Sequence, residues 1–138
     1  MIKALFHRLR DDRAGAAAVE FVMAMPILIT IMIAILQFGL VLQAQGAMRH
    51  GIGEGLRMAK VNASATNAQI LARATNSMSG IDTGNITSIN FTRGTTPMGG
   101  EIADWGRITV NYEMQTLIPF ALIPPIQLNA TRTAYLPS

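Results

Sequence analysis

The sequence predicts an α+β protein in which a long N-terminal transmembrane helix extends into a small domain with one short helix and an antiparallel sheet of about three strands. Three observations lead to this prediction. The stretch 21–42 is almost wholly apolar, apolar side chains keep a helical spacing through 44–60, and the C-terminal half alternates apolar and polar residues. An apolar run of this length is typical of a membrane span, and a two-residue alternation is typical of half-buried strands.

Most of the excess of positive charge lies before Gly15, at the N-terminal end of the chain. The 138 residues are 50% hydrophobic and 14% charged, with a formal net charge of +3. This length allows one domain plus a membrane anchor. No long Lys/Arg stripe follows Gly15, so we expect no nucleic-acid partner. The chain has no cysteine and only two histidines, which excludes disulfides and thiolate or histidine-rich metal sites, and we expect no cofactor and no bound metal.

The apolar segment 21–42 is long enough to cross a bilayer. Only Thr30, Gln37 and Gly39 interrupt it, and a helix of this length would measure about 33 Å, against about 30 Å for the hydrocarbon core. A secretory signal has a shorter apolar region before its cleavage site, which disfavours cleavage after Gly46. The flanking bases are Lys3, Arg8, Arg10 and Arg13 on one side and Arg49, Arg57 and Lys60 on the other. Their excess on the first side favours a cytoplasmic N-terminus, by a single residue.

Beyond the span, helical spacing predicts that the first helix continues to about Lys60. Three glycines at 51, 53 and 55 weaken it and mark either a bend or a close contact with a neighbouring helix. A second helix is expected at 65–75 with Ser64 as its N-cap. Strands are expected at 85–92, 107–115 and 126–136, a loop at 95–100, and a proline-broken apolar stretch at 117–125. For Gln37 we expect a structural or solvated role near the far interface, in preference to a hydrogen bond to a partner helix. Trp105 and Tyr112 are expected to serve packing more than assembly.

Glu20 is the residue that the apolar pattern does not explain. It stands at the edge of the span, where a charge costs less than the several kcal/mol it costs at the bilayer centre. In one interpretation it is a boundary carboxylate that reaches water. In the other, a membrane-facing peptidase cuts after Gly15, which makes Ala16 the new N-terminus and Glu20 the fifth residue. In a bundle of such helices, the liberated amine of one subunit would then pair with the Glu20 carboxylate of its neighbour. This pairing removes unpaired charges from a region of low dielectric constant. The basic leader before Gly15 and the apolar run after Glu20 favour this second interpretation.

The N-terminal sequence carries a specific resemblance. The motif Arg13-Ala-Gly15-Ala-Ala-Ala-Val19-Glu20-Phe21, followed by an apolar run with Pro26, resembles the start of the TadE/TadF-like pseudopilins, the minor pilin-like components of Tad (Flp) pili. The similarity extends over about 13–60. It implies that a prepilin peptidase cleaves between Gly15 and Ala16, that Glu20 serves processing or assembly, and that Phe21 completes the recognition sequence. Pro26 removes one backbone donor and is expected to kink the helix, unless it is simply tolerated in the span.

The resemblance also implies an organisation and a role. The chain would consist of a leader at 1–15, a transmembrane and extended helix at 16–60, and an extracytoplasmic domain at 61–138. It would lie in the bacterial inner membrane as a single-pass protein with a cytoplasmic N-terminus and a periplasmic domain, or in the extracellular pilus if it joins the fibre. As a minor pilin it would act in Tad pilus assembly, adhesion and surface attachment. Its expected partners are the prepilin peptidase, other pilins and pseudopilins, the Tad assembly machinery and the lipid bilayer.

Two other functions remain open. An uncleaved bitopic protein that tethers a periplasmic binding or scaffold domain would keep residues 1–15. A secreted enzyme or inhibitor released after Gly46 would begin at Ala47. The sequence offers little for catalysis, because its acidic residues form no motif and His50 is the only histidine beyond the leader. We therefore expect no enzyme. The scattered acidic residues are Glu54, Asp82, Glu101, Asp104 and Glu113.

Overall fold

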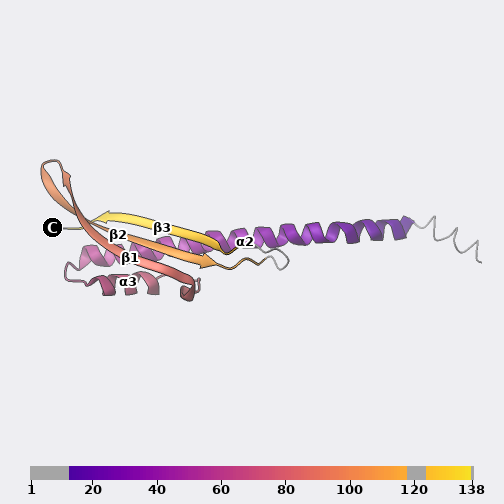
Figure 1. The fold of residues 1–138 in the computed structure, drawn as a ribbon, viewed down its shortest axis with the longest axis horizontal. Coiled ribbons are helices and arrows are strands. Elements are labelled where there is room, and N and C mark those ends of the chain that lie inside the picture. The colour runs from indigo at the N-terminus through magenta and orange to yellow at the C-terminus, as the bar shows by residue number, and fades with distance from the viewer. Residues whose placement is uncertain (1–12, 118–123, 138) are drawn as a thin grey trace, which may run out of the picture. The chain divides into compact units, whose positions relative to one another are not determined.

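The computed structural model describes residues 13–117 and 124–137 (Figure 1). The elements in chain order are α2 (Arg13–Val61), α3 (Asn67–Asn76), the 3-10 turn η1 (Thr83–Asn85), β1 (Ile86–Met98), β2 (Glu101–Met114) and β3 (Ile126–Tyr135). This confirms the α+β class with a long first helix, a short second helix and three antiparallel strands. Packing separates the part of the chain up to Leu36 from a domain that starts at Gln37. Residues 1–12 of the predicted leader and 118–123 of the proline-broken stretch lie outside the described residues.

The helix α2 is continuous from the apolar segment into the domain. It passes through Pro26 and through the three glycines, and it ends one residue beyond the predicted Lys60. The Thr30 Oγ1 donates a hydrogen bond to the Pro26 carbonyl oxygen at 2.8 Å, a local bond of the kind that often accompanies helix bending. The kink at Pro26 stays a prediction.

The helix α3 begins two residues later than predicted, because Thr66 caps it. The Thr66 Oγ1 accepts a hydrogen bond from the Gln69 backbone N–H at 3.3 Å, and the Gln69 side chain accepts one from the Thr66 N–H at 3.0 Å. This reciprocal pair is a capping box, which satisfies two otherwise unpaired donors. The prediction of Ser64 as the cap was wrong, since its hydroxyl donates to the Asn62 side chain instead.

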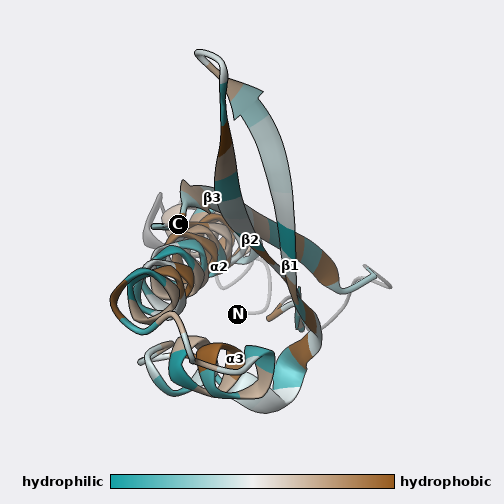
Figure 2. Cartoon of the chain, turned by 90° about the vertical axis from the view of Figure 1, so that its left-hand side faces the viewer, coloured by the Kyte–Doolittle hydropathy of each residue, from teal (hydrophilic) through white to brown (hydrophobic). Residues whose placement is uncertain are grey.

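The sheet has the order β1-β2-β3, and both pairs of strands are antiparallel. The predicted loop at 95–100 was wrong, because β1 and β2 stay paired as far as Met98 and Glu101. Only Gly99 and Gly100 form the turn, with φ of 61° and 93°, which is the left-handed pair that a two-residue hairpin turn requires. Pro97 is accommodated because β1 is an edge strand. The tip of this hairpin extends beyond the last residue that β3 pairs (Figure 2).

The core lies between the inner face of the sheet, α3 and the domain part of α2 (Figure 2). Ile108, Val110 and Tyr112 are buried, as the alternation in this strand predicts. The α2 glycines allow close packing inside the chain. A Cβ on Gly51 would lie 2.5 Å from the Ala74 carbonyl oxygen, and one on Gly55 would lie 2.8 Å from the Ala74 Cβ. Of the two predicted meanings of these glycines, the structure supports the close contact with a neighbouring helix, and that helix is α3. The buried hydrophobic residues of α2 are Ala44, Met48, Ile52, Leu56 and Ala59.

Candidate processing and assembly site

The four residues of the predicted cleavage motif lie on one exposed stretch of α2. Gly15, Ala16, Glu20 and Phe21 are all helical and exposed. Ala16 and Glu20 are four positions apart, so they are neighbours on one helix face, about 6 Å apart along the axis. An amine freed at residue 16 would therefore lie one turn from the Glu20 carboxylate, at the positive end of the helix dipole, where a negative charge is stabilised. The sequence alone suggested a pairing with a neighbouring subunit, and the helix shows that a pairing within one chain is also within reach.

Gly15 has no packing reason to be a glycine. No atom lies within 4 Å of the position that a Cβ would occupy, and its backbone conformation is helical. Glycine in a helix costs about 1 kcal/mol relative to alanine, so it weakens the helix at the predicted cleavage bond. A peptidase has to reach a peptide bond that the helix wraps, and local unwinding at Gly15 would expose it.

The segment around this motif is apolar on all sides. Among residues 15–36 every one is exposed except Ile33, which is half-buried. Over the described residues, the helix from Gly15 is the one candidate for a membrane span, with a mean hydropathy of 2.5 in its most apolar window, none of which is buried. A helix that is hydrophobic all round needs lipid or other helices around it. This agrees with a single-pass membrane protein.

Gln37 marks the point where α2 enters the domain. Its side-chain oxygen accepts a hydrogen bond from the Leu117 N–H at 2.8 Å, and its amide group donates to the Met114 sulfur at 3.3 Å. The side chain is buried, with 7% exposed. Gln37 therefore ties the helix to the end of β2, which is the structural role expected from the sequence.

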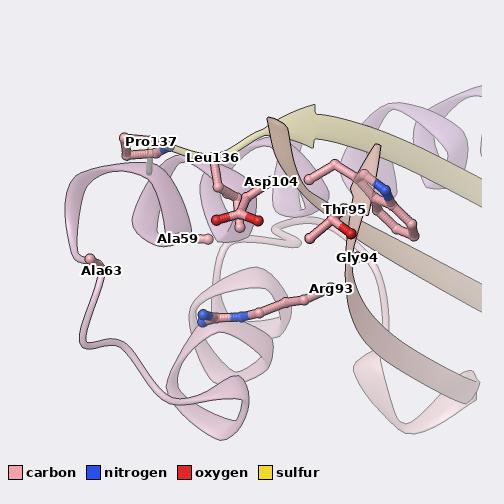
Figure 3. A pocket seen from close by; sticks show the side chains of 9 residues that line it. Ala59, Ala63, Arg93, Gly94, Thr95, Asp104, Leu136 and Pro137 are labelled. Carbon is pink, nitrogen blue, oxygen red and sulfur yellow. The ribbon is translucent and has the colours of Figure 1, made fainter. Parts of the chain in front are cut away.

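A groove with a volume of about 380 Å³ lies beside the end of α2. The Arg93 guanidinium and the Asp104 carboxylate face this space from β1 and β2 (Figure 3). Arg93 donates to the Ala65 carbonyl oxygen at 2.9 Å and lies 5.3 Å from the centre of the Phe91 ring, which holds it in place. The lining also includes the Thr95 side chain, and none of its residues is a histidine.

Three other acidic side chains, those of Glu54, Asp82 and Glu113, make structural contacts. Glu54 accepts a hydrogen bond from Arg73 at 2.8 Å, which is the main reason that the pKa of its carboxyl is lowered from 4.5. Asp82 accepts from the Gly84 N–H at 2.9 Å, and Glu113 accepts from the Gln127 amide at 2.9 Å. Over the described part of the chain, no three His, Cys, Asp or Glu side chains come together in a group that could hold a metal ion.

Together, the fold and the exposed apolar helix define a membrane-anchored protein with a small α+β domain. Residues 15–57 match the model of the TadE-like protein family. The match begins at Gly15 and confirms the resemblance read from the N-terminal motif. No curated protein and no solved structure matches the chain.

Sequence reasoning missed two features of the domain. One is the groove between Arg93 and Asp104. The other is a group of basic side chains where Arg132 of β3 meets α2. Arg132 could have been noticed, because the alternation of β3 places it in the same set as the inward-facing Leu128 and Ala130.

Proposed function

We propose that this protein is a minor pilin or pseudopilin that a prepilin peptidase cleaves between Gly15 and Ala16. The mature chain is held in the inner membrane by its apolar helix, with the N-terminus cytoplasmic before cleavage and the domain in the periplasm. It joins, primes or regulates Tad pilus assembly through helix contacts with other pilins, and so supports adhesion and surface attachment. It is not an enzyme, and it works without a cofactor.

The observation that carries this proposal is the coincidence at Gly15. The family similarity starts at this residue, and the structure gives no packing reason for a glycine there. Glu20 follows within the first turns of the helix that cleavage would create. A carboxylate in this place is stabilised by the helix dipole and by the new amine, whereas in the uncleaved chain it has neither benefit. Processing after Gly15 would account for both features together.

The test is the N-terminal residue and mass of the full-length protein isolated from membranes, in cells with and without the prepilin peptidase. We expect a chain that starts at Ala16 only where the peptidase is present. Gly15→Val should retain Met1. The matched control is Gly39→Val, because Gly39 lies in the same helix and also has no atom within 4 Å of the position that a Cβ would occupy. That variant should be processed normally.

Glu20→Gln separates the two roles predicted for the carboxylate. If Glu20 serves assembly, the variant starts at Ala16 but gives fewer pili. If Glu20 serves recognition by the peptidase, the variant keeps its leader. A deletion strain should lose pili and surface attachment, and normal pilus number and adhesion in that strain would refute the proposal.

The two alternatives predict other N-termini. An intact Met1 in the presence of the peptidase would indicate an uncleaved bitopic protein that tethers a binding or scaffold domain. A soluble product that starts at Ala47 would indicate release after Gly46. The second outcome has a structural cost, since such a cut removes Gln37 and Ala44, which are buried in the domain.

A further inference from the structure

A basic groove lies on the domain where α2 and β3 meet. Arg57 and Lys60 of α2 and Arg132 of β3 line it, together with Gly53, Leu56 and Ala134. The groove has a volume of about 210 Å³, and all three basic side chains are exposed. None of its residues lies in the apolar segment, so this site does not depend on cleavage at Gly15.

The fold brings these three charges together from distant parts of the sequence. Arg132 occupies an inward-facing position of β3, opposite Ile108 of β2, so its side chain is directed towards α2. Gly53 leaves room for it, since a Cβ on that glycine would lie 3.5 Å from the Arg132 Nη1. Arg57 and Lys60 are three positions apart on α2 and therefore share a face. They also lie near the C-terminal end of that helix, where the dipole stabilises cations.

The acidic residues of the domain do not neutralise this groove. Glu54 is held by Arg73 at 2.8 Å and approaches Arg57 at only 3.9 Å. Over the described residues, no salt bridge joins Lys60 or Arg132 to an acid, and no acidic side chain lines the groove. Glu54 is a weak counter-charge to Arg57 alone, so the three cations of the groove still carry an excess of positive charge, and a negatively charged group placed among them relieves their repulsion.

We propose that this groove docks an acidic segment, with two or more Asp or Glu side chains, of a partner protein other than a second copy of this chain. A second copy that used the same surface would bring the same three cations, because a two-fold interface sets a patch against itself. Arg57 is 15 positions beyond Leu42, or about 22 Å along α2 from the end of the apolar segment. Anionic lipid headgroups at that end lie too far away to fill the groove. Charge complementarity of this kind steers association and selects the partner more than it adds affinity.

The test uses the full chain in neutral detergent micelles and a fluorescent ten-residue peptide rich in glutamate as the probe. Binding is followed by fluorescence anisotropy at low and high salt. We expect Arg57→Gln combined with Arg132→Gln to weaken binding about fivefold, since each exposed ion pair contributes a factor of about two to five. The matched control is Arg107→Gln, compared with Arg57→Gln and Arg132→Gln as single variants; it removes one positive charge from β2 outside the groove and should leave binding nearly unchanged. Raising the salt concentration should weaken the wild type more than the groove variant.

Charge reversal guards against a variant that simply misfolds. Arg57→Glu combined with Arg132→Glu should lose the glutamate peptide and bind a lysine-rich peptide of the same length. The proposal is overturned if the groove and control variants lose binding equally, or if the reversed protein prefers neither peptide.

A second measurement tests the other occupants of the groove. Because the chain has no cysteine, Gly53→Cys places a single thiol beside Arg132. Efficient disulfide-linked dimers of this variant would show that a second copy fills the groove. Vesicles that contain anionic lipid are added to the wild-type protein with its bound peptide, and neutral vesicles serve as the control. Displacement of the peptide by the anionic vesicles alone would show that the groove binds lipid headgroups. Either result would overturn the proposal.

Discussion

Adding one methyl group at Gly51 is the sharpest test of how α2 packs on α3. In Gly51→Ala the new Cβ would lie 2.5 Å from the Ala74 carbonyl oxygen and would overlap the Met78 side chain, whereas ordinary contacts begin near 3.4 Å. The backbone of α3 must move away and the Met78 side chain must also shift, and overpacking of this kind costs about 1–3 kcal/mol. Replacing glycine by alanine in a helix returns about 1 kcal/mol. We therefore expect the free energy of unfolding to fall by about 0–2 kcal/mol, which leaves this variant about 1–3 kcal/mol less stable than helix preference alone would make it.

Gly46→Ala is the control in the same helix. No atom lies within 4 Å of its Cβ position, so only the helix-forming preference of alanine acts, and the variant should gain about 0.5–1 kcal/mol. The assay is urea unfolding of the full chain in micelles, followed by the fluorescence of Trp105, the single tryptophan, which lies in β2. If Gly51→Ala proves as stable as Gly46→Ala, the two helices do not approach this closely, and the glycines mark a bend instead.

Three further changes test the contacts that hold the domain together. Arg73 lowers the pKa of the Glu54 carboxyl in the folded state, so the pair stabilises the fold above the ordinary pKa of 4.5, and this stability is lost as pH falls through the lower folded pKa. Glu54→Gln should therefore flatten the acid limb of the curve of unfolding free energy against pH. An unchanged acid limb would contradict the pairing. Gln37→Leu leaves the Leu117 N–H without its acceptor and should lower the free energy of unfolding by about 1–3 kcal/mol in the same urea assay. Gly100→Val places a β-branched residue at a φ of 93° and should cost at least about 1–2 kcal/mol, measured by thermal unfolding; an unchanged melting temperature would mean that this turn is not formed.

The elements with a strong period could be predicted from the sequence, and those set by a local contact could not. The apolar run, the helical spacing towards Lys60 and the alternation around Val110 each repeat often enough to identify a helix or a strand. The hairpin turn was misplaced because Thr95–Gly100 contains Pro97 and two glycines, which read as a loop. The pairing of β1 with β2 continues through Pro97, and a sequence pattern does not show that pairing.

The candidate site divides in the same way. Gly15, Glu20 and Phe21 follow one another in a short motif, so the sequence alone could single them out. The basic groove joins Arg57 and Arg132, which are 75 positions apart, and their proximity depends on the register of β3 against β2. On the outer face of the sheet, Asn111 accepts from the Asn129 amide at 2.6 Å and donates to the Ser88 hydroxyl at 2.8 Å. Such cross-strand bonds follow from register, which composition does not encode.

The position of the core on α2 also has a consequence during biosynthesis. Met48, Ile52 and Leu56 leave the ribosome long before Ile108, the sheet residue buried with them. At about 5–20 residues per second, the interval between Leu56 and Ile108 lasts about 3–10 s. Until β2 emerges, α3 is available to cover part of this apolar helix face, and the part that packs on the sheet stays uncovered. This face is a ready target for a holding chaperone, whose release would be timed by the arrival of β2.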